Sequence, residues 1–357
     1  MKKKVMVAMS GGVDSSVAAL LLREEGFDVV GVTMCFDIAA EKGRRPGCCG
    51  PSGIQDARRV ARDLKIPHYV LPYGRLLEEK VVLDFISEYI SGRTPNPCVR
   101  CNQHLKFGHL LAKARVMGLS HLATGHYARL EKSGSSLILK KGVDRKKDQS
   151  YFLCCVRAAD LRRVLLPLGG MTKEEVRAVA RKKGLPVAEK PGSQEICFIP
   201  GNDYRAFLKG RLNAACFRSG DVVDRSGKVL GRHKGVFHFT IGQREGLGIS
   251  APYPLYVSRL DEKNNRVIVG PKEEVFSSVL VAGELNSFAS GNFKKITRVE
   301  AKIRYNHPQV PARLTPLTGK KIKVKFEVAQ PAVTPGQFVV LYRGDIVLGG
   351  AKILENS

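Results

Sequence analysis

The chain has 357 residues, of which 43% are apolar and 26% charged, an ordinary composition for a globular protein of two or three domains. Its 59 Lys and Arg residues outnumber its 33 Asp and Glu residues, which gives a net charge of +26. This excess is far beyond what solubility requires and indicates a polyanionic partner such as a nucleic acid. The apolar runs are too short to span a membrane, and residues 1–4 lead into a core strand rather than an apolar signal region. We therefore expect a cytoplasmic protein with no membrane partner.

The cysteine content bears on chemistry because disulfides are rare in the cytosol. Thiols, metal ligands or catalytic groups are the expected roles of these side chains. The chain has nine of them: Cys35, Cys48, Cys49, Cys98, Cys101, Cys154, Cys155, Cys197 and Cys216.

The first predicted elements are a buried strand at residues 5–8 and an apolar helix that ends near Glu25, joined by the stretch Ser-Gly-Gly-Val-Asp-Ser-Ser at 10–16. Gly11 and Gly12 allow the backbone to approach an anion closely, and the start of a helix favours negative charge. The stretch predicts a phosphate-binding turn that needs no lysine, unlike the G-x-x-x-x-G-K-[ST] loop, which the chain lacks. The simpler alternative is a glycine-rich turn in which Asp14 or Ser15 caps the helix.

A second parallel strand is expected at residues 29–33, and Met34 at its end lies where an adenine could rest. Strands and helices continue to alternate, which favours a parallel α/β sheet. Two prolines in residues 92–102 predict an exposed, stiff loop. Thr172 and Glu175 form a capping box at the start of a helix. The other expected elements are helices at 54–64, 75–91, 105–117 and 172–183, strands at 68–71 and 121–124, a hairpin tip at 133–135, and a polar run at 144–152 that enters an apolar helix.

After residue 200 the pattern changes to short β segments separated by glycine turns, with strands expected at 322–328, 338–342 and 346–354. We therefore expect an α/β parallel-sheet domain at 1–200, a small central β-containing domain at 201–272 and a C-terminal β-barrel domain at 273–357.

Several strings in a shared order make the chain resemble the bacterial tRNA-specific 2-thiouridylases, members of the ATP pyrophosphatase (PP-loop) superfamily. They lie at residues 10–15, 93–102, 123–129, 148–153, 195–199, 240–249 and 302–308. The resemblance implies ATP-dependent 2-thiolation of the wobble uridine of tRNA, with adenylation of the C2 oxygen, sulfur transfer from a cysteine persulfide, and release of AMP and pyrophosphate. It implies ATP with Mg as the cofactor, and tRNA and a persulfide-bearing donor protein, a cysteine desulfurase or sulfur relay protein, as partners.

The resemblance also implies roles for single residues. The nucleophile falls on Cys101 and the persulfide carrier on Cys197, and the two are implied to meet and form a disulfide. ATP contacts fall on Ala8, Met9, Ser10, Gly11, Gly12, Val13, Asp14, Ser15, Met34 and Gly125. Contacts to tRNA fall on Asn96, Pro97, Cys98, His126, Lys147, Asp148, Gln149, Arg304, Tyr305 and Gln337.

Some alternatives stay open at the level of sequence. Cys98 and Cys101 form a C-x-x-C pair that could hold a metal or iron–sulfur cluster with Cys197, aided by Cys48 and Cys49, or could be plain thiols. We expect the polar loop around Cys101 to leave its thiol accessible, with Arg100 favouring the thiolate. Cys154 and Cys155 are expected in the core. An amide- or amidine-forming ATP pyrophosphatase and a non-catalytic RNA-binding protein with structural zinc are the competing functions.

Overall fold

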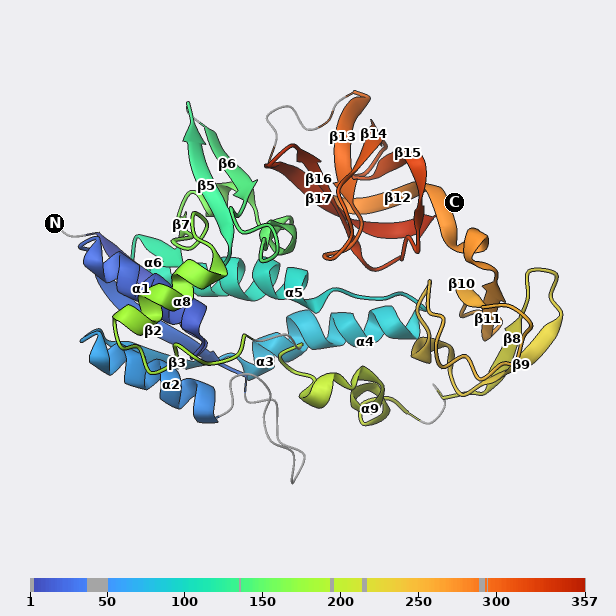
Figure 1. The fold of residues 1–357 in the computed structure, drawn as a ribbon, viewed down its shortest axis with the longest axis horizontal. Coiled ribbons are helices and arrows are strands. Elements are labelled where there is room, and N and C mark those ends of the chain that lie inside the picture. Colours follow the sequence, from blue (N-terminus) through green and yellow to red (C-terminus); the bar gives the residue numbers. More distant parts are fainter. Residues whose placement is uncertain are drawn as a thin grey trace. The chain divides into compact units, whose positions relative to one another are not determined.

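The structure is a computed structural model that describes residues 3–36, 51–134, 136–192, 196–213, 217–288, 293 and 295–356. The chain forms two compact units (Figure 1). The first contains residues 1–82, 97–203 and 345–348, and the second contains residues 83–96, 204–344 and 349–357.

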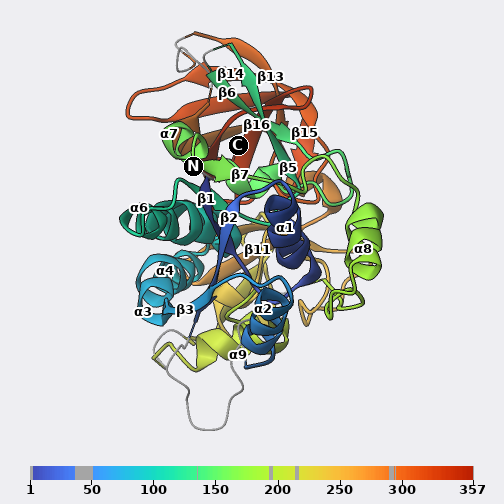
Figure 2. The ribbon, with the colours of Figure 1, turned by 90° about the vertical axis from the view of Figure 1, so that its left-hand side faces the viewer.

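The first unit is built on a parallel sheet with the strand order β3-β2-β1-β4-β7. Figure 2 shows α1, α2 and α8 on one side of these strands and α6 on the other, the arrangement of an α/β fold wound in both directions. The core on the first side contains Val5 and Val7 of β1, Val17 of α1, Val60 of α2 and Val176 of α8. The five strands are β1 (Lys4–Ala8), β2 (Asp28–Cys35), β3 (His68–Pro72), β4 (His121–Ala123) and β7 (Val164–Leu165).

The helices of this unit follow the predicted order. They are α1 (Val13–Glu24), α2 (Pro51–Asp63), α3 (Gly74–Leu77), η1 (Glu78–Val82), α5 (Pro97–Arg100), η2 (Cys101–Leu110), α6 (Leu111–Val116), η3 (Ser150–Leu153), α7 (Ala158–Leu161), α8 (Lys173–Lys182) and η4 (Pro200–Asn202). The hairpin of β5 (Ala128–Ser133) and β6 (Ser136–Lys141) is also present, and Ile346 of β17 pairs with Lys140 of β6.

Two local predictions for this unit are wrong. The segment from Pro97 to Asn102 is helical rather than a loop, because a proline at the first helical position has a suitable φ and needs no amide donor there. The polar run at 144–152 leads only into the short 3₁₀ turn η3. The N-cap of α1 is Gly12, so the cap by Asp14 or Ser15 in the simpler alternative is not formed. The capping box of Thr172 and Glu175 at α8 is confirmed.

The second unit contains a small four-stranded sheet, in the order β10-β11-β8-β9, with Val222, Val257, Val267 and Val269 in its core. β8 and β11 are parallel, and the other neighbours are antiparallel. The elements of this part are α4 (Leu83–Ile90), α9 (Tyr204–Lys209), β8 (Gly220–Val223), β9 (Val229–His233), η6 (Val236–His238), β10 (Tyr256–Asp261), β11 (Arg266–Gly270) and η7 (Lys272–Val275).

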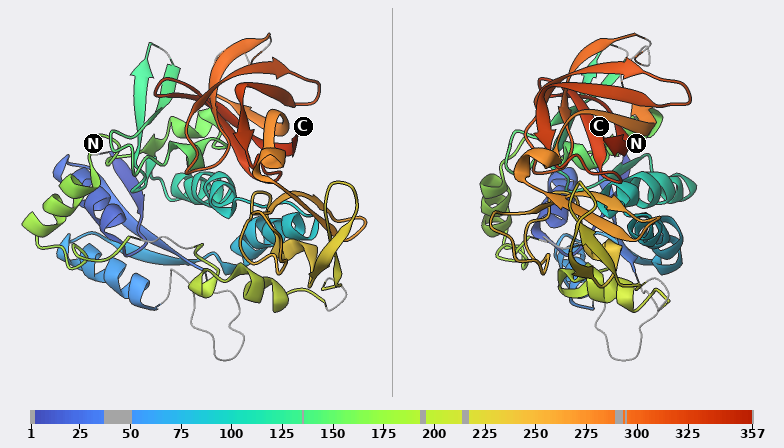
Figure 3. Two further views of the ribbon diagram at one scale, coloured as in Figure 1. Left: turned by 45° about the vertical axis from the view of Figure 1, so that its right-hand side comes forward. Right: turned by 90° about the vertical axis from the view of Figure 1, so that its right-hand side faces the viewer.

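The remaining strands form a closed barrel, coloured orange and red in Figure 3. Their order is β12-β15-β14-β13-β16-β17, and pairing of β12 with β17 closes the circle. The strands are β12 (Phe276–Ser287), β13 (Thr297–Lys302), β14 (Val310–Pro316), β15 (Ile322–Pro331), β16 (Phe338–Arg343) and β17 (Ile346–Asn356). The predicted barrel is confirmed, although the sequence pattern located only its last three strands.

Candidate active site

The glycine-rich stretch lies directly after β1, the central strand of the parallel sheet. Gly11 has a left-handed φ of +74°, and Gly12 is the extended residue that precedes α1. A Cβ on Gly11 would lie 2.1 Å from the carbonyl oxygen of Gly53 in α2, whereas a Cβ on Gly12 would meet nothing closer than 3.5 Å. Gly11 is therefore required by the fold, and Gly12 leaves open space beside the start of the helix.

The serine hydroxyls in this stretch hold the turn itself. Ser15 Oγ accepts a hydrogen bond from the Ser10 amide at 3.2 Å and donates to the Gly12 carbonyl at 3.2 Å. Ser16 Oγ donates to the same carbonyl at 2.9 Å. The hydroxyls of Ser15 and Ser16 thus form bonds within the turn, and Ser10 is the exposed serine of the stretch.

The turn occupies the position at which the strand order reverses. β1 lies between β2 and β4, so the segments that follow β1 and β4 leave the sheet side by side. Gly125, just after β4, approaches the loop so closely that a Cβ there would lie 2.8 Å from the backbone of Asp14 and Ser15. Such a reversal point at the carboxyl ends of parallel strands is where α/β sheets bind ligands. Met34 lies near the same end of β2 and is 8% exposed.

Three residues from distant parts of the chain contact the loop, and none of these contacts was predicted. The Asp14 carboxylate accepts hydrogen bonds from Tyr127 Oη, at 2.7 Å, and Lys173 Nζ. Lys190 Nζ donates to the Gly11 carbonyl at 3.0 Å and to Asp56 Oδ2 at 2.6 Å. Burial, followed by the bond to Asp14, raises the pKa of Tyr127, so this phenol stays protonated as a donor.

His126, predicted to contact tRNA, follows Gly125 and is 9% exposed. Its Nδ1 lies 2.8 Å from Thr124 Oγ1, and its ring is 5.9 Å from that of Phe107. Burial, helped by the charge of Lys106, lowers the pKa of His126 well below its usual value. The imidazole is therefore neutral at physiological pH and suited to hydrogen bonding rather than to pairing with a phosphate.

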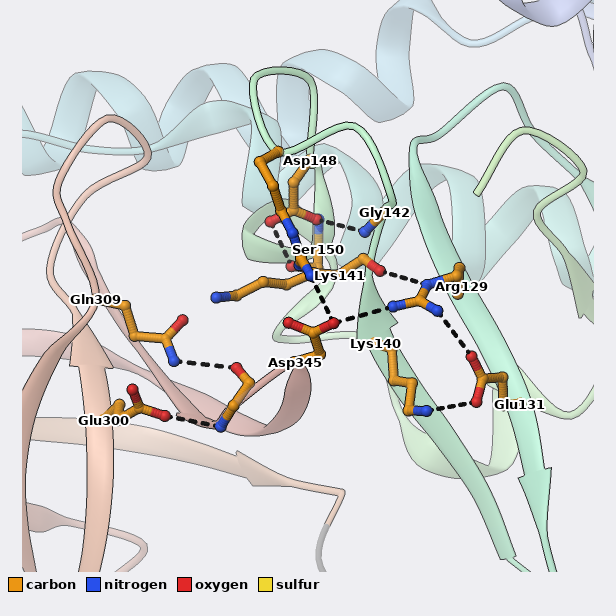
Figure 4. A network of polar contacts seen from close by, with 12 residues as sticks. Arg129, Glu131, Lys140, Lys141, Gly142, Asp148, Ser150, Glu300, Gln309 and Asp345 are labelled. Atoms are coloured by element: carbon orange, nitrogen blue, oxygen red, sulfur yellow. Dashed lines mark hydrogen bonds and ion pairs between the residues drawn. The ribbon is translucent and has the colours of Figure 1, made fainter. Parts of the chain in front are cut away.

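The predicted tRNA-contacting run 147–149 divides into exposed and buried members. Lys147 is exposed, whereas Asp148 is buried and accepts hydrogen bonds from the amides of Gly142 and Ser150 and from the Ser150 hydroxyl (Figure 4). Gln149 is half-buried and its Oε1 accepts from the Tyr127 amide at 3.1 Å. Asp148 thus shapes the turn from inside, and Lys147 is the side chain that the turn presents to solvent.

The same close-up contains a charged cluster around Asp345, where the C-terminal part of the chain returns to the first unit (Figure 4). Asp345 Oδ2 accepts from Arg129 at 3.2 Å and from Arg145 at 2.7 Å. Arg129 also pairs with Glu131. Asp345 thus links Arg129 of the β5–β6 hairpin to Arg145 of the polar run at 144–152.

The candidate cysteines differ in exposure. Cys98 is exposed, Cys197 is half-buried, and Cys101, the first residue of η2, is 9% exposed. The expectation of an accessible Cys101 thiol is wrong, because the helix that starts at Pro97 turns this side chain inward. Cys154 and Cys155 are buried as predicted, and burial raises the pKa of Cys154 well above its usual value.

Cys48, Cys49 and Cys216 lie outside the described residues. Within the described part of the chain, no three His, Cys, Asp or Glu side chains are placed to hold a metal ion.

The remaining predicted tRNA contacts lie in the second unit, except Pro97, which is buried in the first. Gln337 Nε2 donates to the carbonyls of Thr94 and Pro95, at 3.0 and 3.1 Å, and its Oε1 lies 3.5 Å from Asn96 Nδ2. The structure therefore brings Asn96 and Gln337 together although they are 241 residues apart. Arg304 and Tyr305 are half-buried in the segment just after β13, and Arg304 donates to the Ala332 carbonyl at 3.3 Å.

Comparisons with known proteins extend over nearly the whole chain. Residues 3–201 match a family described as the tRNA methyl transferase HUP domain, 205–271 the tRNA methyl transferase PRC-barrel domain, and 277–353 the aminomethyltransferase beta-barrel domain.

No helix among the described residues is long and apolar enough to cross a membrane.

Curated relatives are similar along the full length. The tRNA-specific 2-thiouridylase MnmA 1 of Syntrophus aciditrophicus is 52% identical over 355 residues, which cover 99% of this chain and 94% of the relative. The enzymes named MnmA of Geobacter metallireducens and Acetivibrio thermocellus are 50% and 47% identical, and each match covers 99% of this chain and at least 97% of the relative. The chain belongs to the tRNA-specific 2-thiouridylase family.

Proposed function

We propose that this protein is a cytoplasmic tRNA-uridine 2-sulfurtransferase that binds ATP, as its magnesium complex, on the loop at residues 8–15. The observation that carries the proposal is the glycine turn at the strand-order reversal. Gly12 leaves open space beside the start of α1, and Gly125 allows the segment after β4 to approach the loop. Backbone amides and a helix N-terminus at such a place suit phosphate oxygens. Met34, at the end of the neighbouring strand, is the proposed adenine contact.

The chemistry follows in two steps. In the first, the uridine C2 oxygen attacks the α-phosphorus of ATP and pyrophosphate leaves, so that a poor leaving group becomes AMP. In the second, the terminal sulfur of a Cys197 persulfide attacks C2 and AMP leaves. The Cys101 thiolate then attacks the Cys197 sulfur, forming a disulfide, and the electron pair of the broken S–S bond stays on the sulfur at C2. A thiol reductant restores both cysteines, and a donor protein reloads Cys197.

Binding of tRNA is supported by an exposed basic row on the barrel. Arg298 lies directly opposite Arg313 in the β13–β14 pair, and Arg313 lies directly opposite Lys325 in the β14–β15 pair. All three side chains are exposed. Like charges directly opposite one another destabilise a sheet, and a polyanion on this face relieves the repulsion. With Lys147 and the net charge of +26, this row suits a phosphodiester backbone.

We assign the roles within the chain accordingly. Residues 1–200 activate the base, residues 273–357 contribute to binding of tRNA, and residues 201–272 form the small central β-containing domain. Asn96, Pro97, Cys98 and His126 are the proposed contacts near the target base, and Lys147, Asp148, Gln149, Arg304, Tyr305 and Gln337 form the wider tRNA contact, in which Asp148 serves by shaping its turn.

The test is a complete reaction with purified protein, ATP, magnesium, tRNA and a ³⁵S-persulfide donor protein. We expect AMP and pyrophosphate to form only with tRNA, and label to appear in 2-thiouridine. Cys101→Ser and Cys197→Ser should keep tRNA affinity and lose thiolation, because serine cannot carry a persulfide. Thiolation by the Cys197→Ser variant would refute the carrier role. An iron–sulfur absorption band that both variants lose would instead favour a cluster on Cys98, Cys101 and Cys197.

A further inference from the structure

Two helices of the first unit start together at the phosphate loop. Lys173, the first residue of α8, pairs with Asp14 in the first turn of α1, and Lys183 after α8 pairs with Glu24 at the end of α1. Because the starts are joined and the ends are joined, α1 and α8 run parallel. Both helix N-termini, which carry partial positive charge, therefore lie at the loop.

The two ion pairs between these helices differ in their surroundings. The Lys173 side chain is only 12% exposed, whereas that of Lys183 is 44% exposed. The Lys173 amide donates to Asp144 Oδ2 at 3.0 Å, and the capping box of the preceding Thr172 fixes the first turn of α8. Its ammonium also lies 5.8 Å from the centre of the Tyr127 ring. The backbone of Lys173 is thus fixed, and its charge is directed at the Asp14 carboxylate.

A second lysine contacts the backbone of the loop. Lys190 Nζ donates to the carbonyl of Gly11, the residue with φ of +74°. Asp56 on α2 accepts from the same ammonium at 2.6 Å and holds it in place. The Gly11 carbonyl oxygen, the negative end of its peptide dipole, is therefore occupied by a cation.

We propose that Lys173 and Lys190 are positioning residues for the phosphates of the bound nucleoside triphosphate. This inference depends on the proposed ATP reaction and adds two residues to it. The loop has no lysine of its own, and a triphosphate must approach a turn that contains the Asp14 carboxylate. Lys173 compensates that carboxylate, and Lys190 holds the Gly11 carbonyl and the left-handed turn. Other nucleotide-binding loops contain their own lysine. Here the positive charge comes from Lys173, 159 positions after Asp14, and from Lys190, 179 positions after Gly11.

The test compares Lys173→Met and Lys190→Met with Lys183→Met, which removes the exposed pair between the same two helices. Calorimetry with magnesium ATP gives the Kd for ATP, filter binding gives the Kd for tRNA, and melting curves report folding. We expect the first two variants to bind ATP about tenfold more weakly, the usual effect of losing a charged hydrogen bond. Binding of tRNA should change less than twofold, and Lys183→Met should resemble wild type.

Two further variants separate positioning from structural support. Lys173→Arg keeps the charge and should recover most of the ATP affinity even where Lys173→Met folds poorly. In the Asp14→Asn, Lys173→Met double variant no carboxylate remains to compensate, so ATP should bind more tightly than to Lys173→Met alone. If Lys173→Met and Lys190→Met bind ATP as tightly as Lys183→Met does, this inference is wrong, but the proposed function still stands. A wild-type protein that binds no ATP would instead refute the proposed function on which it depends.

Discussion

The two adjacent glycines of the phosphate loop should respond in opposite ways to substitution. Gly11→Ala places a side chain at φ of +74°, which costs about 1–2 kcal/mol for a residue other than glycine. Its Cβ would also lie 2.1 Å from the Gly53 carbonyl oxygen, and the backbone shift that this forces costs about 1–3 kcal/mol. We therefore expect the free energy of unfolding of the first unit to fall by about 2–5 kcal/mol.

Gly12 provides the matched comparison. Its φ is −99°, and the nearest atom to an added Cβ, Ser10 Oγ, is 3.5 Å away. Gly12→Ala should cost at most about 1 kcal/mol, the usual difference between these residues at an N-cap. Gly12→Val should also leave a folded protein, but its side chain fills the space through which phosphates approach, so that tRNA-dependent pyrophosphate release is lost.

Urea unfolding followed by circular dichroism measures the first effect, and a coupled pyrophosphate assay at saturating tRNA measures the second. We expect Gly11→Ala to lose stability, and Gly12→Val to stay folded but lose activity. A Gly11→Ala protein as stable as wild type would refute the backbone geometry of the turn. A folded Gly12→Val protein with full pyrophosphate release would remove the loop from the mechanism.

Three shorter predictions concern charge, protonation and thiol exposure. Lys147→Gln should weaken tRNA binding without changing stability, and it should reduce the slope of log binding constant against log salt concentration by about one. Filter binding between low and moderate salt measures this slope. An unchanged slope would exclude a phosphate contact by Lys147. Burial lowers the pKa of His126, so as the pH falls through the ordinary value of 6.5 the unfolded chain binds the proton first and the folded protein loses stability. His126→Gln should therefore flatten the dependence of the urea midpoint on pH between about 7 and 5. An unchanged dependence would contradict the burial of His126. Iodoacetamide followed by peptide mass spectrometry should modify exposed Cys98 well before buried Cys101, and equal rates would contradict the helix that starts at Pro97.

The sequence predicted the parts of the site in which neighbours along the chain determine the structure. The strand, turn and helix around Gly11 and Gly12 form from adjacent residues, and the capping box joins Thr172 to Glu175, only three positions further along the chain. Lys173 and Lys190 could not be predicted in this way, because their spacing from the loop is fixed only when α8 packs beside α1. The buried position of Asp148 was missed for a related reason: its three hydrogen bonds come from a turn whose shape a charged run does not reveal.

The helix that begins at Pro97 affects the proposed sulfur step, because it contains Cys101. Two prolines suggested a loop, but a proline in the first helical turn lacks only a donor that the helix does not use, so the helix begins there and includes Cys98 and Cys101. Cys101 is then only 9% exposed, so little of its thiol is accessible from solvent. The proposed disulfide requires the Cα atoms of Cys101 and Cys197 to lie within about 7 Å of each other, and we expect the start of this helix to move when the substrates bind and to expose the Cys101 thiol. Faster alkylation of Cys101 in the presence of tRNA and a non-hydrolysable ATP analogue would support this movement, whereas unchanged protection of Cys101 would contradict it.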